Sequence, residues 1–162
     1  MMLKYRAMDD PANIARIKKL FQEGGIDPSR LMLYGSTPHV DLLNHYNKID
    51  IALDPAPYSG GLTTCEALWM GTPVVTYPGA TFGGRHSQSI LSCAGLTETI
   101  ADDFDQYVEF AVGLAEDIPR LAEISAGLRQ QMAESPLIDG IAFAKKLSTA
   151  MQSIWKDWCQ EN

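Results

Sequence analysis

A chain of 162 residues, of which 46% are hydrophobic and 20% charged, is long enough to bury one sizeable core. The formal net charge of -7, without a basic stripe, argues against nucleic acid as a partner, because phosphate backbones require dense Lys and Arg surfaces. The sequence has no run of about 18 apolar residues and no secretion signal, so we expect a cytoplasmic protein that makes no membrane contact.

The first hundred residues alternate short apolar segments with helical patterns. Asp9-Asp10-Pro11 is typical of a helix start, and Gly24-Gly25 of a helix end. The predicted strands cover residues 1–5, 30–34, 49–53 and 74–77. The predicted helices between and after them cover residues 11–23, 39–46, 63–70 and 85–93, and a last short extended segment follows Gly95.

The remainder of the chain is predicted to be helical, over residues 103–116, 118–133 and 139–158. Short strands that alternate with helices and hold few polar residues indicate a parallel sheet covered on both faces. The predicted fold class is therefore α/β, with a doubly wound parallel sheet over residues 1–100 and a helical tail over 103–158. We expect both parts to form a single domain over residues 1–162.

A ligand site is expected where the strands end, because doubly wound sheets bind ligands at the carboxyl ends of their strands. Three loops qualify, at residues 35–38, 54–64 and 78–85. The middle loop has the richest chemistry, since it places two glycines and two threonines directly before a helix. Glycines let a backbone approach a ligand, and a helix N-terminus suits a phosphate. An ordinary turn between strand and helix is the alternative.

Several side chains near these loops allow two interpretations. Glu66 could accept hydrogen bonds from ribose hydroxyls in the first turn of the helix, or could cap that helix together with Thr63 as a Thr-x-x-Glu capping box. Arg85 could line a pocket or lie at the surface, and His39 could contact a base or be exposed. Trp69 is expected in the core.

Metal ligands are not expected. Cys65, Cys93 and Cys159 lie far apart, with no neighbouring histidine at ligand spacing. Neither a structural zinc nor a disulfide framework is predicted.

The central segment strongly resembles a known family. Residues 50–76, DIALDPAPYSGGLTTCEALWMGTPVVT, resemble the C-terminal catalytic half of the O-linked N-acetylglucosamine transferase family, including its bacterial and SPINDLY-like members. The similarity continues through Gly84-Arg85 and residues 89–91, and reaches residues 135–137 and the final tryptophan-containing helix. It therefore covers nearly the whole chain.

The resemblance implies a GT-B glycosyltransferase whose C-terminal half holds a UDP-sugar, most simply UDP-N-acetylglucosamine for transfer to a Ser or Thr hydroxyl of a protein acceptor. It implies ribose binding by Glu66 and no metal cofactor. The implied donor diphosphate contacts are Gly60, Gly61, Leu62, Thr63 and Thr64. The implied base or pocket contacts are Thr37, Pro38, His39, Leu42 and Arg85.

The chain also departs from the family pattern. Leu42 stands where the family usually presents a histidine to the uracil, and Leu62 stands where many members have a hydroxyl residue. The family's lysine near the diphosphate and its N-terminal half with the acceptor groove would lie upstream of Met1. No catalytic residue is therefore assigned within this chain.

Two further expectations follow from this alignment. The chain is expected to be inactive alone and to require the missing N-terminal half or a homodimer, with Trp155 and Trp158 packing the last helix against a neighbour. The alternatives are a non-catalytic Rossmann-like interaction or regulatory module and, less compatible with the sequence match, a sugar-nucleotide epimerase.

Overall fold

The structure is a computed structural model that describes residues 1–161. It contains two compact units, Met1–Ile49 and a second unit that begins at Asp50, and each is described by itself. The single domain expected over residues 1–162 stays a prediction.

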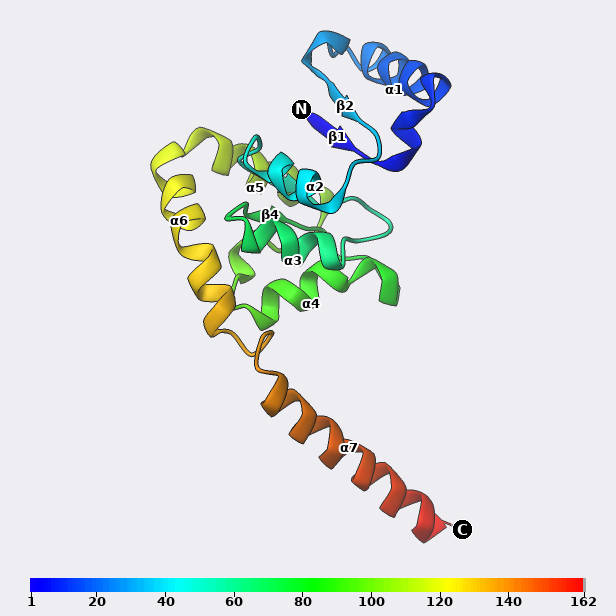
Figure 1. Cartoon of the computed structure of the whole chain (residues 1–162), viewed down its shortest axis with the longest axis vertical. Coiled ribbons are helices and arrows are strands. Elements are labelled where there is room, and N and C mark those ends of the chain that lie inside the picture. The colour runs from blue at the N-terminus through cyan, green and yellow to red at the C-terminus, as the bar shows by residue number, and fades with distance from the viewer. Residues whose placement is uncertain (162) are drawn as a thin grey trace. The chain divides into compact units, whose positions relative to one another are not determined.

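The first unit contains one strand-helix-strand motif (Figure 1). Strand β1 (Met2–Lys4) pairs in parallel with β2 (Met32–Tyr34), and Met2 faces Met32 in the register. The helix between them, α1 (Pro11–Glu23), starts after Asp10, whose side chain accepts a hydrogen bond from the backbone N–H of Ala12. Short 3-10 turns flank α1 at Arg6–Asp9 and Pro28–Arg30, and α2 (His39–Tyr46) closes the unit.

The second unit continues the alternation and then becomes helical. Strand β3 (Ala52–Leu53) pairs in parallel with β4 (Val74–Val75), and a parallel bridge between Thr76 and Ile100 extends the pairing. Short 3-10 turns lie at Phe82–Gly84 and Thr97–Thr99. The helices are α3 (Leu62–Trp69), α4 (His86–Cys93), α5 (Phe104–Glu116), α6 (Ile118–Glu134) and α7 (Gly140–Glu161).

Parallel pairing and the α/β alternation are confirmed. Each hydrogen-bonded sheet in the described residues has two strands, β1 with β2 and β3 with β4. The strands are shorter than predicted; in β3 the ladder ends before Pro55, which has no backbone N–H to donate. One continuous doubly wound sheet stays a prediction.

The core of the second unit lies between its helices and β4. Leu68, Val75, Leu91 and Leu128 are almost fully buried. Helix α6 packs against both α3 and α5. Trp69, which we expected in the core, is instead 41% exposed, and the Arg129 guanidinium of α6 lies 5.4 Å from its ring centroid. The prediction for Trp69 was wrong, because Leu68 occupies the buried face of α3, whereas Trp69 lies at the surface beside the exposed Arg129 of α6.

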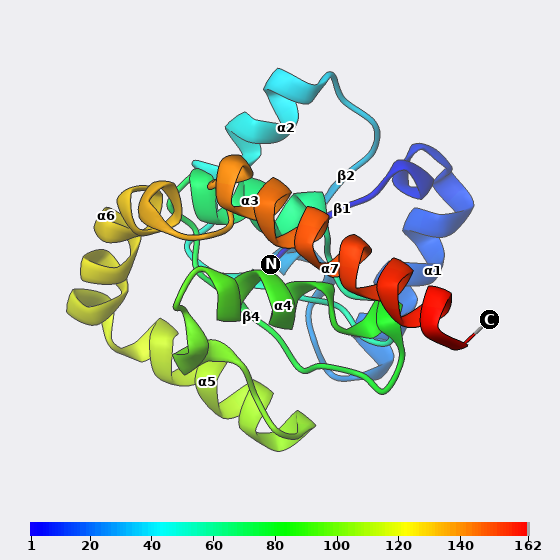
Figure 2. The ribbon, with the colours of Figure 1, turned by 90° about the horizontal axis from the view of Figure 1, so that it is seen from below.

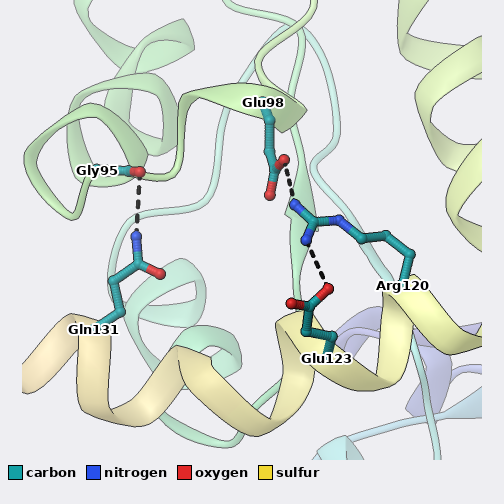
Figure 3. Close-up of polar contacts among 5 residues, drawn as sticks. All are labelled: Gly95, Glu98, Arg120, Glu123 and Gln131. Carbon is teal, nitrogen blue, oxygen red and sulfur yellow. Dashed lines mark hydrogen bonds and ion pairs between the residues drawn. The ribbon is translucent and has the colours of Figure 1, made fainter.

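Polar contacts also attach α6 to the segment that follows α4 (Figure 3). The Arg120 guanidinium bridges Glu98, at 2.8 Å, and Glu123, at 2.9 Å. About three turns farther along the same helix, Gln131 Nε2 donates to the carbonyl oxygen of Gly95 at 3.2 Å. These contacts attach α6 to the segment between Gly95 and Glu98, which leads into Ile100, the partner of Thr76 in the parallel bridge.

Helix α7 is continuous (Figure 2). It exposes apolar side chains. Trp155 and Trp158 are 64% and 55% exposed and stack on each other with ring centroids 5.3 Å apart. The packing expected for them against a neighbour stays a prediction. Among the helices of residues 1–161, none is both long and apolar enough to span a membrane.

Candidate functional site

The glycine-rich loop leads into an uncapped helix start. Helix α3 begins at Leu62, with Gly61 at the N-cap position. The N-cap residue therefore provides no side-chain oxygen to accept a hydrogen bond from the backbone N–H groups of the first turn. Thr63 is therefore the second helical residue, and Glu66 lies in the second turn rather than the first. The capping-box interpretation was wrong, since its threonine would have to precede the helix. The first turn instead presents backbone N–H groups where an anion is favoured.

Gly60 lies in a space that excludes a side chain. A Cβ atom built there would lie 2.6 Å from Thr64 Oγ1, 3.0 Å from Thr63 Oγ1 and 3.2 Å from Asp54 Oδ1. At the neighbouring Gly61 the nearest atom to such a Cβ, His86 Nδ1, is 4.0 Å away. The first glycine is thus required by close packing, while the second has space beside it.

Serine and threonine hydroxyls hold this loop to the start of α4. Ser87 is fully buried; its backbone N–H donates to Ser59 Oγ at 2.8 Å and its hydroxyl donates to the carbonyl oxygen of Gly60 at 3.0 Å. The hydroxyls of Ser87 and Thr64 lie 2.7 Å apart. The Thr64 side chain is therefore buried within the scaffold, whereas Thr63, one residue earlier, is exposed.

A buried carboxylate supports the same loop from the other side. Asp54, the residue after β3, is 8% exposed. Its Oδ1 accepts the Gly60 N–H at 2.6 Å, and its Oδ2 accepts the Thr76 hydroxyl at 2.7 Å. The Tyr107 hydroxyl of α5 donates to the Asp54 carbonyl oxygen at 3.1 Å. Burial, and secondarily the charge of Asp54, raise the pKa of Tyr107.

Sequence reasoning missed Asp54, Ser59, Thr76 and Ser87. For Asp54 a signal was present, because an aspartate that directly follows a strand lies at the edge of the sheet where ligand loops gather. For Ser87 no local signal distinguishes it from an ordinary helical serine, since its partners lie 27 and 28 residues earlier in the chain.

The third loop packs against the glycine-rich one. The backbone N–H of Ser59 donates to the Gly83 carbonyl at 3.0 Å, and a Cβ at Gly84 would lie 3.0 Å from the Pro57 carbonyl oxygen. Arg85 is exposed, and its guanidinium donates to the carbonyl oxygens of Gly79 and Ala80. Arg85 therefore closes its own loop, and a contact between Arg85 and a ligand stays a prediction.

Aromatic side chains border the start of α3. His86, the first residue of α4, meets the Phe82 ring edge-on at 4.7 Å and the Tyr58 ring edge-on at 5.9 Å. Phe82 is 86% exposed and Tyr58 71% exposed. These rings leave an apolar rim beside the polar loop.

The other predicted contacts, Thr37, Pro38, His39 and Leu42, belong to the first unit. Pro38 is the N-cap residue of α2 and has no side-chain cap bond, and Leu42 is half-buried.

The loop that precedes Thr37 is held by β1 and its neighbours: Lys4 Nζ donates to the Gly35 carbonyl at 2.7 Å, and the Ser36 N–H donates to Asp9 Oδ1 at 2.9 Å. Hydrogen bonds from Ser36 lower the pKa of Asp9. A Cβ at Gly35 would collide with the Asp9 carboxylate, so a side chain there would displace Asp9 from its hydrogen bond with the Ser36 N–H.

Metal ligands do not gather in the part of the chain that the structure describes. Within residues 1–161 there is no group of three or more His, Cys, Asp or Glu side chains that could hold a metal ion. The absence of a metal requirement nevertheless stays a prediction.

Comparison with known proteins decides the family. Residues 2–147 match the sequence profile of Glycosyl transferase family 41. The chain belongs to this family. The family 41 chain is 38% identical over 149 residues to the probable UDP-N-acetylglucosamine–peptide N-acetylglucosaminyltransferase SPINDLY of Petunia hybrida, and 29% identical over 140 residues to the UDP-N-acetylglucosamine–peptide N-acetylglucosaminyltransferase of Caenorhabditis elegans.

A solved structure supports the same assignment. A mutant O-GlcNAc transferase of Thermobaculum terrenum superposes on 98% of the family 41 chain, with a TM-score of 0.91 and 38% sequence identity. The resemblance to the O-linked N-acetylglucosamine transferases is therefore confirmed.

The matched proteins are much longer than this chain. The family 41 chain aligns with 89% of its own residues to the Petunia protein but spans only 16% of that protein, and it spans 31% of the Thermobaculum chain. The chain thus corresponds to a part of a glycosyltransferase.

Proposed function

We propose that this chain is the UDP-sugar-binding part of a protein O-glycosyltransferase, with UDP-N-acetylglucosamine as the donor and a Ser or Thr hydroxyl as the acceptor. The names of the relatives support this donor and a peptide acceptor. The single observation that carries the proposal is the uncapped start of α3 behind a tightly held glycine loop. We further propose that the chain acts as one half of a GT-B enzyme and that its parallel strands belong to a doubly wound, Rossmann-like sheet.

The diphosphate is proposed to bind at the first turn of α3. Backbone N–H groups of Leu62 and Thr63 would face it, and the exposed Thr63 would add its hydroxyl. Gly60 and Gly61 would allow the backbone to come close. Thr64 would act indirectly, because its buried hydroxyl hydrogen-bonds with that of Ser87. The positive end of the α3 dipole would stabilise negative charge on the departing UDP.

Glu66 is proposed to bind the ribose. A carboxylate can accept hydrogen bonds from two vicinal hydroxyls. The proposed base or pocket contacts remain Thr37, Pro38, His39, Leu42 and Arg85. With leucine at position 42, base recognition would rest on apolar contact and on backbone groups rather than on an imidazole ring.

No residue of this chain is proposed as the general base. The acceptor groove and the base would come from an N-terminal half or from a second copy, so the chain alone would be inactive. No metal is proposed, since neutralisation of the diphosphate is assigned to the helix start. A cytoplasmic location is proposed.

Calorimetric titration of UDP into the chain, in buffer treated with a chelator, tests the proposal. We expect saturable binding that is weakened at least about tenfold by Thr63→Ala combined with Glu66→Gln, because the first removes a hydroxyl donor and the second replaces one of two carboxylate acceptors with an amide donor, each at a cost of about 1 kcal/mol. Thr149→Ala serves as the matched control; Thr149 lies on α7 and its hydroxyl donates to the Lys145 carbonyl. Its affinity for UDP should equal that of the unchanged chain.

Parallel titrations with UDP-N-acetylglucosamine and with GDP test the donor. Tighter binding of UDP than of GDP would support uracil as the base of the donor. Tighter binding of GDP would instead indicate a guanine-nucleotide donor, with the same proposed diphosphate site. No binding of any of the three at millimolar concentration would favour the non-catalytic module.

A further inference from the structure

Asp54 is a buried negative charge next to the proposed diphosphate loop. Taking a carboxylate out of water is costly unless hydrogen bonds compensate it. Both carboxylate oxygens of Asp54 are satisfied by neutral donors, the Gly60 N–H at 2.6 Å and the Thr76 hydroxyl at 2.7 Å. The carboxylate therefore joins the glycine loop to the residue that follows β4.

The Gly60 residue is held from both sides. Its N–H is bound by Asp54, and its carbonyl oxygen accepts the Ser87 hydroxyl at 3.0 Å. Gly61 follows as the N-cap of α3, so the orientation of Gly60 sets the direction in which the chain enters the helix. These two hydrogen bonds fix the backbone directly before the first turn of α3.

A negative charge close to a site for a dianion opposes binding by its field. Its retention is accounted for by the strength of its hydrogen bonds, because bonds to an ionised acceptor are shorter and about twice as strong as neutral ones. The short contact to Gly60 agrees with such a bond. The geometric contribution of Asp54 and its electrostatic contribution thus have opposite signs for a bound diphosphate.

We infer that Asp54 is a positioning residue that holds Gly60 and the start of α3 in the geometry that binds diphosphate, without touching the ligand. The inference rests on the proposed function, since it concerns the same site. It adds Asp54, which acts on the site through Gly60, and Thr76, which is fully buried after β4 and anchors Asp54.

Three substitutions separate the roles. Asp54→Asn keeps the shape: its amide oxygen can accept the Gly60 N–H, and its NH₂ group can donate to the Thr76 hydroxyl oxygen. Asp54→Ala removes both bonds. Thr76→Val removes only the contact to Oδ2 and is nearly isosteric. A control for stability alone is Leu128→Ala, in the buried face of α6, far along the chain from the loop.

The measurements are UDP affinity by calorimetry and thermal unfolding of each variant of this chain. Loss of a hydrogen bond to a charged group predicts about tenfold or greater weakening of UDP binding by Asp54→Ala. Asp54→Asn should stay within about threefold of the unchanged chain, because weaker bonds are offset by removal of the repulsive charge. Leu128→Ala should lower the Tm while leaving UDP affinity unchanged below the transition.

The outcomes distinguish this inference from the proposed function. If the unchanged chain binds UDP and Asp54→Ala binds it equally well, the positioning role is refuted and the site stands. If the unchanged chain binds no UDP, the proposed function fails and the inference fails with it. Should Asp54→Ala not fold, weaker binding by Thr76→Val with binding retained by Asp54→Asn supports the inference, and unchanged binding by both overturns it.

Discussion

A methyl group at position 60 tests how tightly the glycine loop is packed. In Gly60→Ala the new Cβ would lie 2.6 Å from Thr64 Oγ1, well inside van der Waals contact. The Thr64 hydroxyl cannot simply rotate away, since it hydrogen-bonds with Ser87, and Asp54 Oδ1 closes another side at 3.2 Å. Overpacking of this kind costs about 1–3 kcal/mol.

For a chain of this length, that cost predicts a Tm lower by roughly 2 to 12 °C. The displaced loop should also bind UDP at least about fivefold more weakly, because every 1.4 kcal/mol corresponds to a factor of ten. Both effects are measurable, by differential scanning calorimetry and by titration at a temperature where the variant is folded.

Gly61→Ala is the matched control for Gly60→Ala. The nearest atom to its Cβ is 4.0 Å away, so the added methyl group meets open space. We expect Gly61→Ala to lower the Tm less than Gly60→Ala does. If the two variants lose equal stability, the argument that close packing requires Gly60 is refuted.

The remaining predictions concern the scaffold of the second unit. Leu128→Ala, at a side chain only 1% exposed, should lower the free energy of unfolding in urea by about 2–5 kcal/mol, and a loss below 1 kcal/mol would mean that the site collapses without a cavity. Gly127→Ala lies inside α6 with no atom within 4 Å of its Cβ, and it should raise that free energy by about 0.5–1 kcal/mol. Arg120→Ala breaks ion pairs whose side chains are 43–72% exposed, so its effect on the Tm should be small and should shrink in high salt. The pKa of Tyr107 is raised in the folded chain, so its neutral form stabilises the fold below the unfolded pKa of about 10, and this contribution is lost as the pH rises through the folded pKa. Tyr107→Phe should therefore flatten the loss of stability between neutral and strongly alkaline pH. An unchanged dependence of stability on pH would contradict the raised pKa of Tyr107.

The helices of this chain could be predicted from the sequence because their signals are local. Asp10 caps α1, Asp103 caps α5 and Asp117 caps α6, each through a side-chain oxygen that accepts a backbone N–H within three residues. Gly25, with φ of 79°, supplies the left-handed turn that ends the first helix. Such signals act over a single turn, so a sequence carries them without its fold.

The location of the candidate site also followed from local sequence. A run of glycines and threonines before a helix marks the start of α3, and residues 50–76 carry the resemblance that the family match confirms. The local sequence did not determine which side chains of α3 are buried and which are exposed. The sequence allowed Trp69 in the core and Thr63 as a cap, but α6 covers Leu68 instead, and the helix begins one residue earlier than expected.

What only the tertiary structure decided is the support beneath the loop. The partners of Asp54 are 6 and 22 residues away in the chain, and Ser87 reaches back 27 residues to Gly60. Hydrogen bonds between distant segments depend on where parallel strands end in space, and no periodicity or spacing encodes that. The sequence alone determined where the helix start proposed to bind phosphate would lie, and the packing of four distant segments determined which buried groups hold it in place.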